Sequence, residues 1–329
     1  IASIAAGGQE NQDSVEAAGG VKLLVGLVAG AAKDETVKST KPGLLVEEWE
    51  VQAQAARALG DLGNDNTGIQ AAATSYGGIE PLINLIKSSS CDEPKEQAAY
   101  ALWRLASKCF DNQVAIATAD GLTALVTLAG STTDLGQRMA AEALASLALD
   151  NVENQASVSE LLIKLLANSP SISTEREKAA RAISRFAAAH KANQDALATA
   201  DGVQLVVSQL NPQKYEAPPL GAPTKEGKDK IDVEEETEVE EVKESVGEHH
   251  LVQRELCSAL WSVSFEHAAN QQAIANSGGI PQLIALLSDN PEIHREAAGA
   301  LWSLAADVDN QKVMQARAEF RSLLTFCGR

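Results

Sequence analysis

The sequence predicts an all-α protein, a right-handed α-solenoid of about six to seven repeats. Two observations point to this fold class. An Asn-Gln pair recurs at intervals of about forty residues, and between the pairs lie apolar segments of helical period. Aromatic residues make up only 4% of the chain, while Ala, Leu, Ile and Val dominate, which suits closely packed short helices. Because stacked repeats bury apolar surface against their neighbours, residues 1–329 can form a single solenoid without one large central core.

The Asn-Gln pair sets the period of the chain. It occurs at Asn11-Gln12, Asn112-Gln113, Asn154-Gln155, Asn193-Gln194, Asn270-Gln271 and Asn310-Gln311, with a looser version from Asn66 to Gln70. From Asn112 onward the intervals are 42, 39, 77 and 40 residues, so one interval is doubled.

Residues 112–148 show one unit without an insertion. The stretch predicts a short first helix with Val114 and Ile116 facing inward, a sharp turn at Gly121, and a second helix directly after it. A polar cluster at 131–134 then precedes a third helix whose apolar side consists of alanines and leucines. Each unit should therefore contain three helices.

The second and third helices carry recurring motifs. Those of the second helix are GGVKLLVGL from Gly19, GGIEPLINLI from Gly77, DGVQLVVSQL from Asp201 and GGIPQLIALL from Gly278. Those of the third helix are QAARALGDLG from Gln54, QAAYALWRLA from Gln97, AAEALASLA from Ala140, KAARAISRFA from Lys178, LCSALWSVS from Leu256 and EAAGALWSLA from Glu296. In this order the motifs resemble the armadillo repeat family over nearly the whole chain. The resemblance implies a concave groove lined by the third helices and binding to other proteins.

Two insertions interrupt the period. Residues 30–47 should form an exposed loop in the first full unit. Residues 211–250 are acidic and rich in Pro and Glu, and we expect a disordered excursion within one repeat, although the part from Asp232 could extend the following helix. A solubilising linker is the simplest role for this segment, with a docking site for a basic partner or an autoinhibitor of the groove as alternatives.

Other stretches also depart from the regular unit. Residues 154–189 lack the Gly-Gly break, so their first helix should be shortened or merged with the second. Residues 1–6 resemble the end of a third helix and residues 310–329 the start of another unit, so the solenoid is expected to be truncated at both ends.

Helical spacing predicts which third-helix residues line the groove. Residues four apart share a face, and the face opposite Ala98, Leu102 and Leu105 carries one triplet in each repeat. The triplets are Ala53, Arg57, Asp61; Glu96, Tyr100, Arg104; Arg138, Glu142, Ser146; Glu177, Arg181, Arg185; Arg254, Ser258, Ser262; and Arg295, Gly299, Ser303. Seven arginines and four acids give this line a balance near +3 in a chain of net charge −18.

Two interpretations of the arginines follow. They can bind carboxylates or carbonyls of an extended acidic or mixed-charge partner segment. Alternatively, they pair within the protein with Asp61, Glu96, Glu142 and Glu177. Trp103, Trp261 and Trp302, one residue before the last groove position, could be apolar shelves for a ligand, or they could pack between adjacent third helices.

An importin-α-like transport adaptor is disfavoured. In that family, a Trp and an Asn four residues apart in successive third helices hold a basic signal. The positions equivalent to the Trp are Arg57, Tyr100, Glu142, Arg181, Ser258 and Gly299 here. Those equivalent to the Asn are Asp61, Arg104, Ser146, Arg185, Ser262 and Ser303.

The sequence contains no catalytic or cofactor-binding motif, such as HExxH, GxSxG or a Walker glycine loop, so no enzyme activity and no cofactor are expected. The cysteines have no zinc-ligand spacing, and Cys109 and Cys257 fall in apolar helical stretches, which favours reduced packing residues and a cytoplasmic location. The net charge argues against nucleic acid as a partner, and no apolar run is long enough to span a membrane.

The sequence therefore predicts a noncatalytic scaffold, eukaryotic in type, that binds other proteins within a larger complex. The alternative is a structural subunit packed permanently into a cytoskeletal or organellar assembly.

Overall fold

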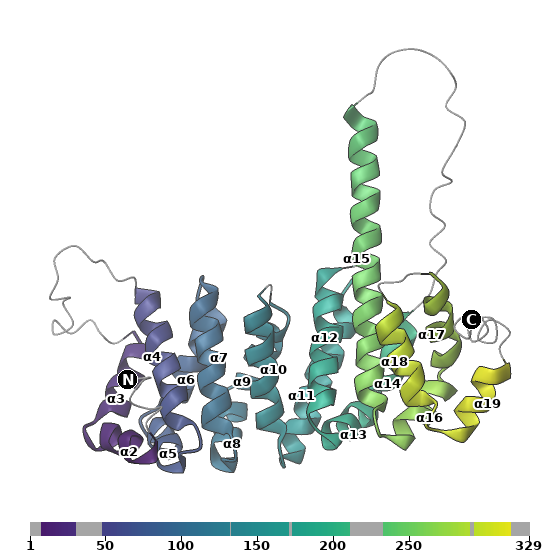
Figure 1. Cartoon of the computed structure of the whole chain (residues 1–329). Helices are drawn as coiled ribbons and strands as arrows, with labels where there is room; N and C mark the ends of the chain where they lie inside the picture. The colour runs from purple at the N-terminus through teal and green to yellow at the C-terminus, as the bar shows by residue number, and fades with distance from the viewer. Residues whose placement is uncertain are drawn as a thin grey trace. The chain divides into compact units, whose positions relative to one another are not determined.

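The computed structural model describes residues 8–30, 48–131, 133–170, 173–210, 233–289 and 293–316, and every regular element in these ranges is an α-helix (Figure 1). The predicted all-α solenoid is confirmed. The chain forms two compact units, Ile1–Leu162 and Ile163–Arg329. The predicted loop insertion lies outside the described residues except for Gly30, as do residues 1–6 and 317–329 at the two ends.

The first unit contains three repeats of three helices. They are α2 (Gln9–Ala17), α3 (Gly20–Val28) and α4 (Glu48–Gly63); α5 (Thr67–Ser75), α6 (Ile79–Ser88) and α7 (Asp92–Ala106); and α8 (Phe110–Thr118), α9 (Gly121–Ala129) and α10 (Asp134–Ala148). The next helix, α11 (Val152–Asn168), is one helix of 17 residues where other repeats have two. The merged helix predicted from the missing Gly-Gly break is confirmed.

The second unit continues the pattern. Its helices are α12 (Thr174–Ala189); α13 (Lys191–Thr199), α14 (Gly202–Leu210) and α15 (Val233–Ser264); α16 (Ala268–Asn276), α17 (Gly279–Asp289) and α18 (His294–Leu304); and finally α19 (Val308–Ala316). Helix α15 has 32 residues because it begins at Val233. Residues 211–232 of the expected disordered excursion lie outside the described residues, and from Val233 onward the alternative of a helical extension holds instead.

Third helices of successive repeats pack side by side. In the first unit α7 lies between α4 and α10, and in the second unit α15 lies between α12 and α18. The leucines of the recurring motif, such as Leu59, Leu102 and Leu144, are at most 1% exposed and form the core between these helices and the shorter ones. Burying each of these side chains contributes roughly 1.5–3 kcal/mol.

The turn between the first and second helices differs from the prediction at one residue. In the third repeat Asp120, not Gly121, has the left-handed backbone conformation, with φ of 62°. Gly121 is needed for close approach, because a Cβ there would lie 2.7 Å from the carbonyl oxygen of Ile116. In Gly-Gly versions of this turn, such as Gly77-Gly78, the first glycine has the positive φ and the second makes the close approach.

One expectation about the first helix of the third repeat is corrected. Val114 is 42% exposed, whereas Ile116 is buried as predicted. The inward side is completed by Asn112 and Gln113, so the buried face of this helix is largely polar.

Of the two cysteines expected to be packing residues, Cys109 is the N-terminal cap residue of α8 and is half-buried. Cys257 is fully buried in α15, where burial raises the pKa of its thiol.

The recurrent Asn binds the end of the preceding third helix. In α8, the amide nitrogen Nδ2 of Asn112 donates to the carbonyl of Leu105 at 2.8 Å and to that of Gln70 at 3.2 Å. Asn270 in α16 repeats this arrangement with Val263 and Gln194. The bonds to Leu105 and Val263 satisfy carbonyl groups that the last turn of a third helix leaves without a partner, whereas Gln70 and Gln194 lie within the first helices of the preceding repeats.

The recurrent Gln of the third and fifth repeats binds the third helix of its own repeat, whereas Gln155, Gln271 and Gln311 donate to the end of the preceding third helix. Nε2 of Gln113 donates to the carbonyls of Ser146 (3.0 Å) and Leu149 (3.3 Å) at the end of α10. Gln194 contacts the end of α15 in the same way. In the third and fifth repeats the adjacent Asn and Gln therefore hold two consecutive third helices at a fixed spacing.

The looser version at Asn66 has a different role. Asn66 caps the N-terminus of α5, because its Oδ1 accepts the N–H of Ile69 at 3.1 Å. Asn151 caps the N-terminus of α11 in the same manner, because its Oδ1 accepts the N–H of Asn154. The position equivalent to the recurrent Asn is therefore occupied by Ile69, and only Gln70 retains its expected role.

We predict that Asn112→Ala lowers the free energy of unfolding by about 1–3 kcal/mol, because two carbonyls lose their buried donor. Urea unfolding followed by circular dichroism measures the change. Asn84→Ala is the control, since Asn84 is exposed on α6 and its substitution should change stability by less than about 0.5 kcal/mol. Equal effects of the two substitutions would contradict the bridging role of Asn112.

Candidate functional site

The candidate site is the exposed side of the third helices, which we call the third-helix face of each unit. In the first unit it is formed by α4, α7 and α10, and in the second by α12, α15 and α18. The predicted triplets lie along these helices, one helical turn apart, but Ala53, Ser146 and Ser303 are buried and do not belong to the exposed face.

Four predicted residues come together in the first unit. The hydroxyl of Tyr100 donates to Oδ1 of Asp61 at 2.8 Å, and Arg57 Nε lies 3.9 Å from the other carboxylate oxygen. Tyr100 reaches α4 because residue 60 is glycine: a Cβ there would lie 2.6 Å from the ring. The ring of Tyr100 thus crosses from α7 onto the neighbouring helix.

Arg104 completes this cluster. Its guanidinium carbon lies 4.1 Å from the ring centre of Trp103 and 5.2 Å from that of Tyr100, and Nη1 donates to Asn64 at 2.9 Å. Arginine over an aromatic face is a favourable cation–π contact. Arg104 is therefore held in place by the aromatic rings of α7 and by Asn64, which directly follows the end of α4.

The environment of Tyr100 shifts its ionisation. Partial burial, followed by the hydrogen bond to Asp61 and the negative charge of that carboxylate, raises the pKa of Tyr100 above its ordinary value of 10.0, while Arg104 opposes the shift. The neutral phenol is therefore favoured in the folded state.

The remaining predicted residues of the first unit lie apart from this cluster. Arg138 and Glu142 on α10 are exposed. Glu96 is buried and accepts a 2.6 Å hydrogen bond from the hydroxyl of Thr133, not from an arginine. The expected intramolecular pairing thus forms for Asp61 with Arg57 but not for Glu96.

In the second unit, carboxylates bind the arginines. Arg181 contacts Glu177 one turn earlier on α12 and Oε1 of Glu255 on α15 at 3.3 Å. Arg254 donates to the same oxygen at 2.9 Å. Burial would lower the pKa of Arg254, but the hydrogen bond and charge of Glu255, with the charges of Glu296 and Glu177, raise it.

Glu255 and Glu296 were missed by the sequence reasoning. Each directly follows the first residue of a triplet, so helical spacing places it beside the predicted line. Glu255 and Glu296 are only 9% and 6% exposed, and Nε of Arg295 donates to Glu296 at 2.9 Å. With these two acids the line has seven arginines and six acids, so its balance falls from +3 to +1.

Serine hydroxyls form hydrogen bonds between neighbouring third helices of the second unit. Oγ of Ser184 on α12 lies 3.0 Å from Oγ of Ser258 and 2.9 Å from Oγ of Ser262, both predicted groove residues on α15. Ser264 donates to Ser303 of α18 at 2.9 Å. The second face is therefore lined by arginine, glutamate and serine, whereas the first is rich in aromatic side chains.

The tryptophans differ in their surroundings. Trp261 lies against Gly299 of α18, where a Cβ would approach its ring to 2.6 Å, so this residue packs between adjacent third helices. Trp103 is half-buried beside Tyr100 and Arg104. Trp302 is 67% exposed and pairs with Phe265, 43% exposed, at a ring-centre distance of 6.3 Å. Trp302 is thus the best placed of the three to serve as an apolar shelf.

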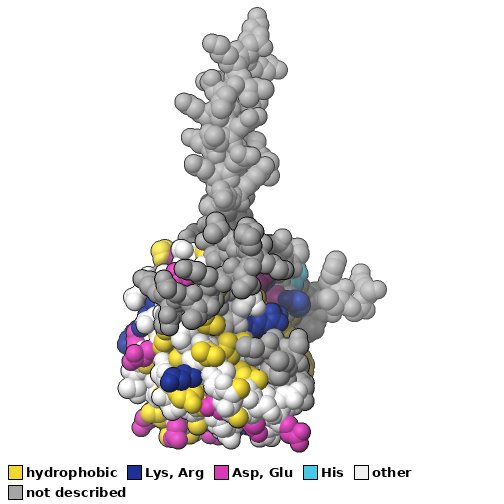
Figure 2. Space-filling model, turned by 90° about the vertical axis from the view of Figure 1, so that its left-hand side faces the viewer, with side chains coloured by type: hydrophobic (Ala, Val, Ile, Leu, Met, Phe, Trp, Pro, Cys, Tyr) yellow, Lys and Arg dark blue, Asp and Glu magenta, His cyan; other side chains and the backbone are white. Residues whose placement is uncertain are grey.

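Acidic residues gather away from the third helices. Helix α2 carries exposed Glu10 and Asp13, and Figure 2, which views the side where α2–α4 lie, shows acidic side chains along its lower edge. Five of the six non-glycine residues with positive φ among the described ranges are acids in turns: Asp65, Asp120, Asp150, Asp201 and Glu266. These turns and helix α2 therefore hold part of the negative charge of the chain.

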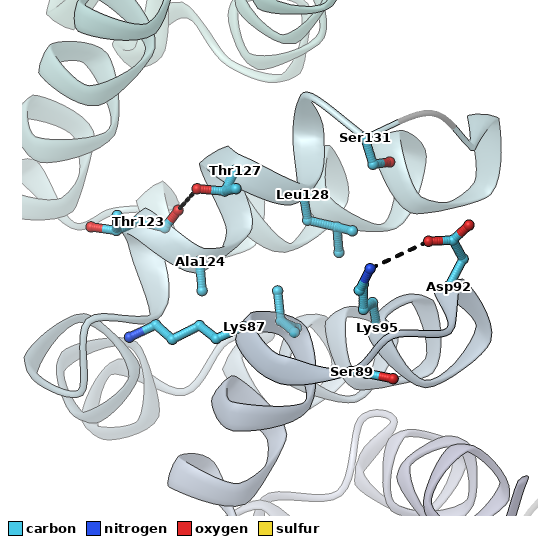
Figure 3. A pocket seen from close by; sticks show the side chains of 10 residues that line it. Lys87, Ser89, Asp92, Lys95, Thr123, Ala124, Thr127, Leu128 and Ser131 are labelled. Atoms are coloured by element: carbon cyan, nitrogen blue, oxygen red, sulfur yellow. Dashed lines mark hydrogen bonds and ion pairs between the residues drawn. The ribbon is translucent and has the colours of Figure 1, made fainter. Parts of the chain in front are cut away.

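A pocket of about 550 Å³ lies over the second helices α6 and α9, away from the predicted line (Figure 3). Apolar Ala124 and Leu128 contribute to its lining. Its cations are already paired, Lys87 with Asp120 at 2.7 Å and Lys95 with Asp92 at 3.4 Å. It therefore offers no uncompensated charge to a ligand.

Within the described ranges, no group of three or more His, Cys, Asp or Glu side chains is arranged to hold a metal ion. In the same part of the chain, no helix has the length and apolar character needed to cross a membrane.

Comparisons with known proteins agree with this architecture. The family model described as Armadillo/beta-catenin-like repeat matches residues 267–306, which contain α16, α17 and α18. No curated protein matches the sequence. Among solved structures, one engineered protein is 28% identical with a TM-score of 0.50, covering 98% of this chain and 70% of its own. A second is 27% identical with a TM-score of 0.45, covering 87% and 96%.

A designed armadillo repeat protein in complex with the peptide (KR)4 is also similar, at 18% identity and a TM-score of 0.44, covering 85% of this chain and 99% of its own.

We predict that Tyr100→Phe destabilises the protein by about 1 kcal/mol at neutral pH, because Asp61 loses a hydrogen-bond donor. The pKa of Tyr100 is raised in the folded state, so its contribution is complete below pH 10.0 and is lost as the pH rises through the folded-state pKa. Urea unfolding at several pH values measures both effects. Tyr76→Phe, at an exposed tyrosine, should have a smaller effect, and a difference for Tyr100→Phe that persists at high pH would contradict the assignment.

Glycine substitutions test how closely the third helices approach each other. Gly299→Ala should destabilise the protein by about 1–3 kcal/mol, because its Cβ would overlap the ring of Trp261. Gly26→Ala on α3 is the control, since no atom lies within 4 Å of its Cβ position and alanine favours the helix by about 0.5–1 kcal/mol. Thermal unfolding should give opposite signs for the two variants. Equal signs would show that Trp261 does not pack on α18 as described.

Proposed function

We propose that this α-solenoid, in which residues 267–306 match an armadillo repeat model, is a noncatalytic scaffold that binds an extended acidic or mixed-charge segment of a partner protein on its third-helix faces. The observation that carries the proposal is the exposure of cations on a face held rigid by the repeats. Arg138 is exposed on α10, and Arg57 remains 56% exposed although it pairs with Asp61. An arginine fork can bind the carboxylate or carbonyl oxygens of such a segment.

The arrangement of Tyr100, Trp103 and Arg104 supports the same function. These side chains fix one another through a ring contact at 6.0 Å and the two cation–π contacts, so little side-chain entropy remains to be lost on binding. A bound segment would find aromatic surface next to fixed cations. In the second unit, Arg181 and Arg185 would act beside the serine hydroxyls of α12 and α15.

We further propose a reducing, cytoplasmic environment. Within the described ranges Cys91, Cys109 and Cys257 are free thiols, which supports this location.

Charge reversal on the first face tests the function. The probe is a fluorescein-labelled octapeptide of alternating Glu and Ser, with a Lys-Ser octapeptide as its counterpart. We expect the Glu-Ser peptide to bind more tightly, and the double variant Arg57→Glu, Arg138→Glu to weaken it about tenfold, because each exposed attraction becomes a repulsion. Fluorescence anisotropy at low ionic strength measures the affinities.

A control that reverses one cation outside the face, compared per reversed charge, separates the effect of the face from that of the overall charge. Lys22→Glu reverses an exposed cation on α3, a second helix, and should change the affinity less than twofold per site because of screening. The same loss for Lys22→Glu as for the double variant, or no loss for either, would contradict binding on the third-helix face.

A further inference from the structure

A small pocket lies at the C-terminal ends of α15 and α18. It has a volume of about 260 Å³, and its lining includes Phe265, Glu266, Gln271, Trp302 and Ser303. Two of these, Trp302 and Phe265, are among the exposed large apolar side chains, and their rings are inclined by 33°. The pocket therefore combines aromatic surface with an acidic residue at the edge of the third-helix face.

In the described ranges, the junction of α15 and α18 lacks a hydrogen-bond bridge that the third and fifth repeats have; in this it resembles the repeat of Gln155, which donates to Ala148 at the end of α10. Gln113 and Gln194 donate to the end of the third helix in their own repeat, which is α10 and α15 respectively. Within the described part of the chain, Gln271 donates to Ser264 at the end of α15, at 3.0 Å, and not to α18. The end of α18 therefore receives no hydrogen bond from the Gln of its own repeat within these ranges. The pocket lies beside this residue, Gln271.

The second repeat shows which kind of side chain binds over a tryptophan at this position of the third helix. Trp103, which has the same position in the third-helix motif as Trp302, carries the guanidinium of Arg104 at 4.1 Å from its ring centre. In the sixth repeat the residue after the tryptophan is Ser303, so Trp302 has no arginine of its own at this position. The smaller serine leaves room where Arg104 lies in the second repeat.

We infer that this pocket binds an arginine side chain of the partner segment, which stacks on Trp302 and Phe265 and directs its guanidinium to Glu266. The inference rests on the proposed function, because it names one side chain of the partner that binds to the third-helix face of the second unit. The partner is thereby a mixed-charge segment, with carboxylates for the arginines of the face and one arginine for this pocket.

The charges of the second unit agree with this orientation. Arg254 and Arg295 lie toward the N-terminal side of the motif, whereas Glu266 follows the C-terminal end of α15 and Asp307 follows that of α18. Helix C-termini carry partial negative charge and favour cations within the last turn. The site also differs from an importin-α-like one, because the tryptophan position of that family is Gly299 in this repeat.

The test compares two labelled octapeptides, Glu-Ser-Glu-Ser-X-Ser-Glu-Ser, in which X is arginine or norleucine. Norleucine keeps the aliphatic stem but lacks the charge. We expect the arginine peptide to bind the wild-type protein roughly fivefold more tightly, the size of a cation–π contact on an exposed ring. Trp302→Leu keeps an apolar side chain without a π-face and should bring the ratio close to one, and Glu266→Gln should lower it.

Phe110→Leu on α8 is the control, since Phe110 is 60% exposed in the first unit and its loss should leave the ratio unchanged. Thermal unfolding verifies that Trp302→Leu is folded. Equal affinities of the two peptides for the wild-type protein, or a preference that Trp302→Leu retains, would overturn the arginine pocket alone. Failure of both peptides to bind would overturn the groove function and this inference together.

Discussion

The structure depends on the buried amides that fix the spacing of the third helices. A helix ends with carbonyl groups that have no partner in the helix, and burial without a donor is costly. Asn112 supplies donors to the end of α7, and Gln113 supplies donors to the end of α10. Because these two residues are adjacent in one short helix, the distance between the ends of α7 and α10 is set by covalent geometry. Apolar packing alone would allow the helices to slide, whereas directional hydrogen bonds do not.

Fixed spacing lets the exposed residues vary without loss of the stack. On the first face, Tyr100 reaches back to Asp61 and Arg104 lies on Trp103. On the second face, Glu255 takes up Arg181 and Arg254. The same helical scaffold thus carries an aromatic and cationic surface in one unit and a nearly neutral, serine-rich surface in the other. Such variation on a constant backbone is what a solenoid offers to extended ligands.

The sequence was sufficient for the features that repeat. The period, the three-helix unit and the merged helix α11 follow from motifs that occur several times, so each error in one copy is corrected by the others. Residues that depend on a single environment were not predictable in this way. Val114 has an apolar side chain but lies on the outer side of α8, because Asn112 and Gln113 take the inner side for their hydrogen bonds.

Long side chains account for the errors in the candidate site. Helical spacing locates the Cβ atom, but Glu255 reaches across to α12 from a position beside the predicted line. Glu96 lies on the line yet turns to Thr133. The direction taken by a carboxylate depends on which donors the neighbouring helix presents, and those donors lie 37 residues away in the sequence for Glu96 and 74 residues away for Glu255. Sequence patterns therefore located the face but not its net charge.

Glycine determines how flat the third-helix faces become. Gly60 admits the ring of Tyr100 from the following helix, and Gly299 admits the ring of Trp261 from the preceding one. In both places a large ring occupies the volume that a Cβ would take, so the aromatic residue lies across its neighbour instead of projecting into solvent. A ring lying across two helices also joins them through van der Waals contact. Trp302 has no such contact in the described ranges beyond its ring pair with Phe265, and its exposure follows from that difference.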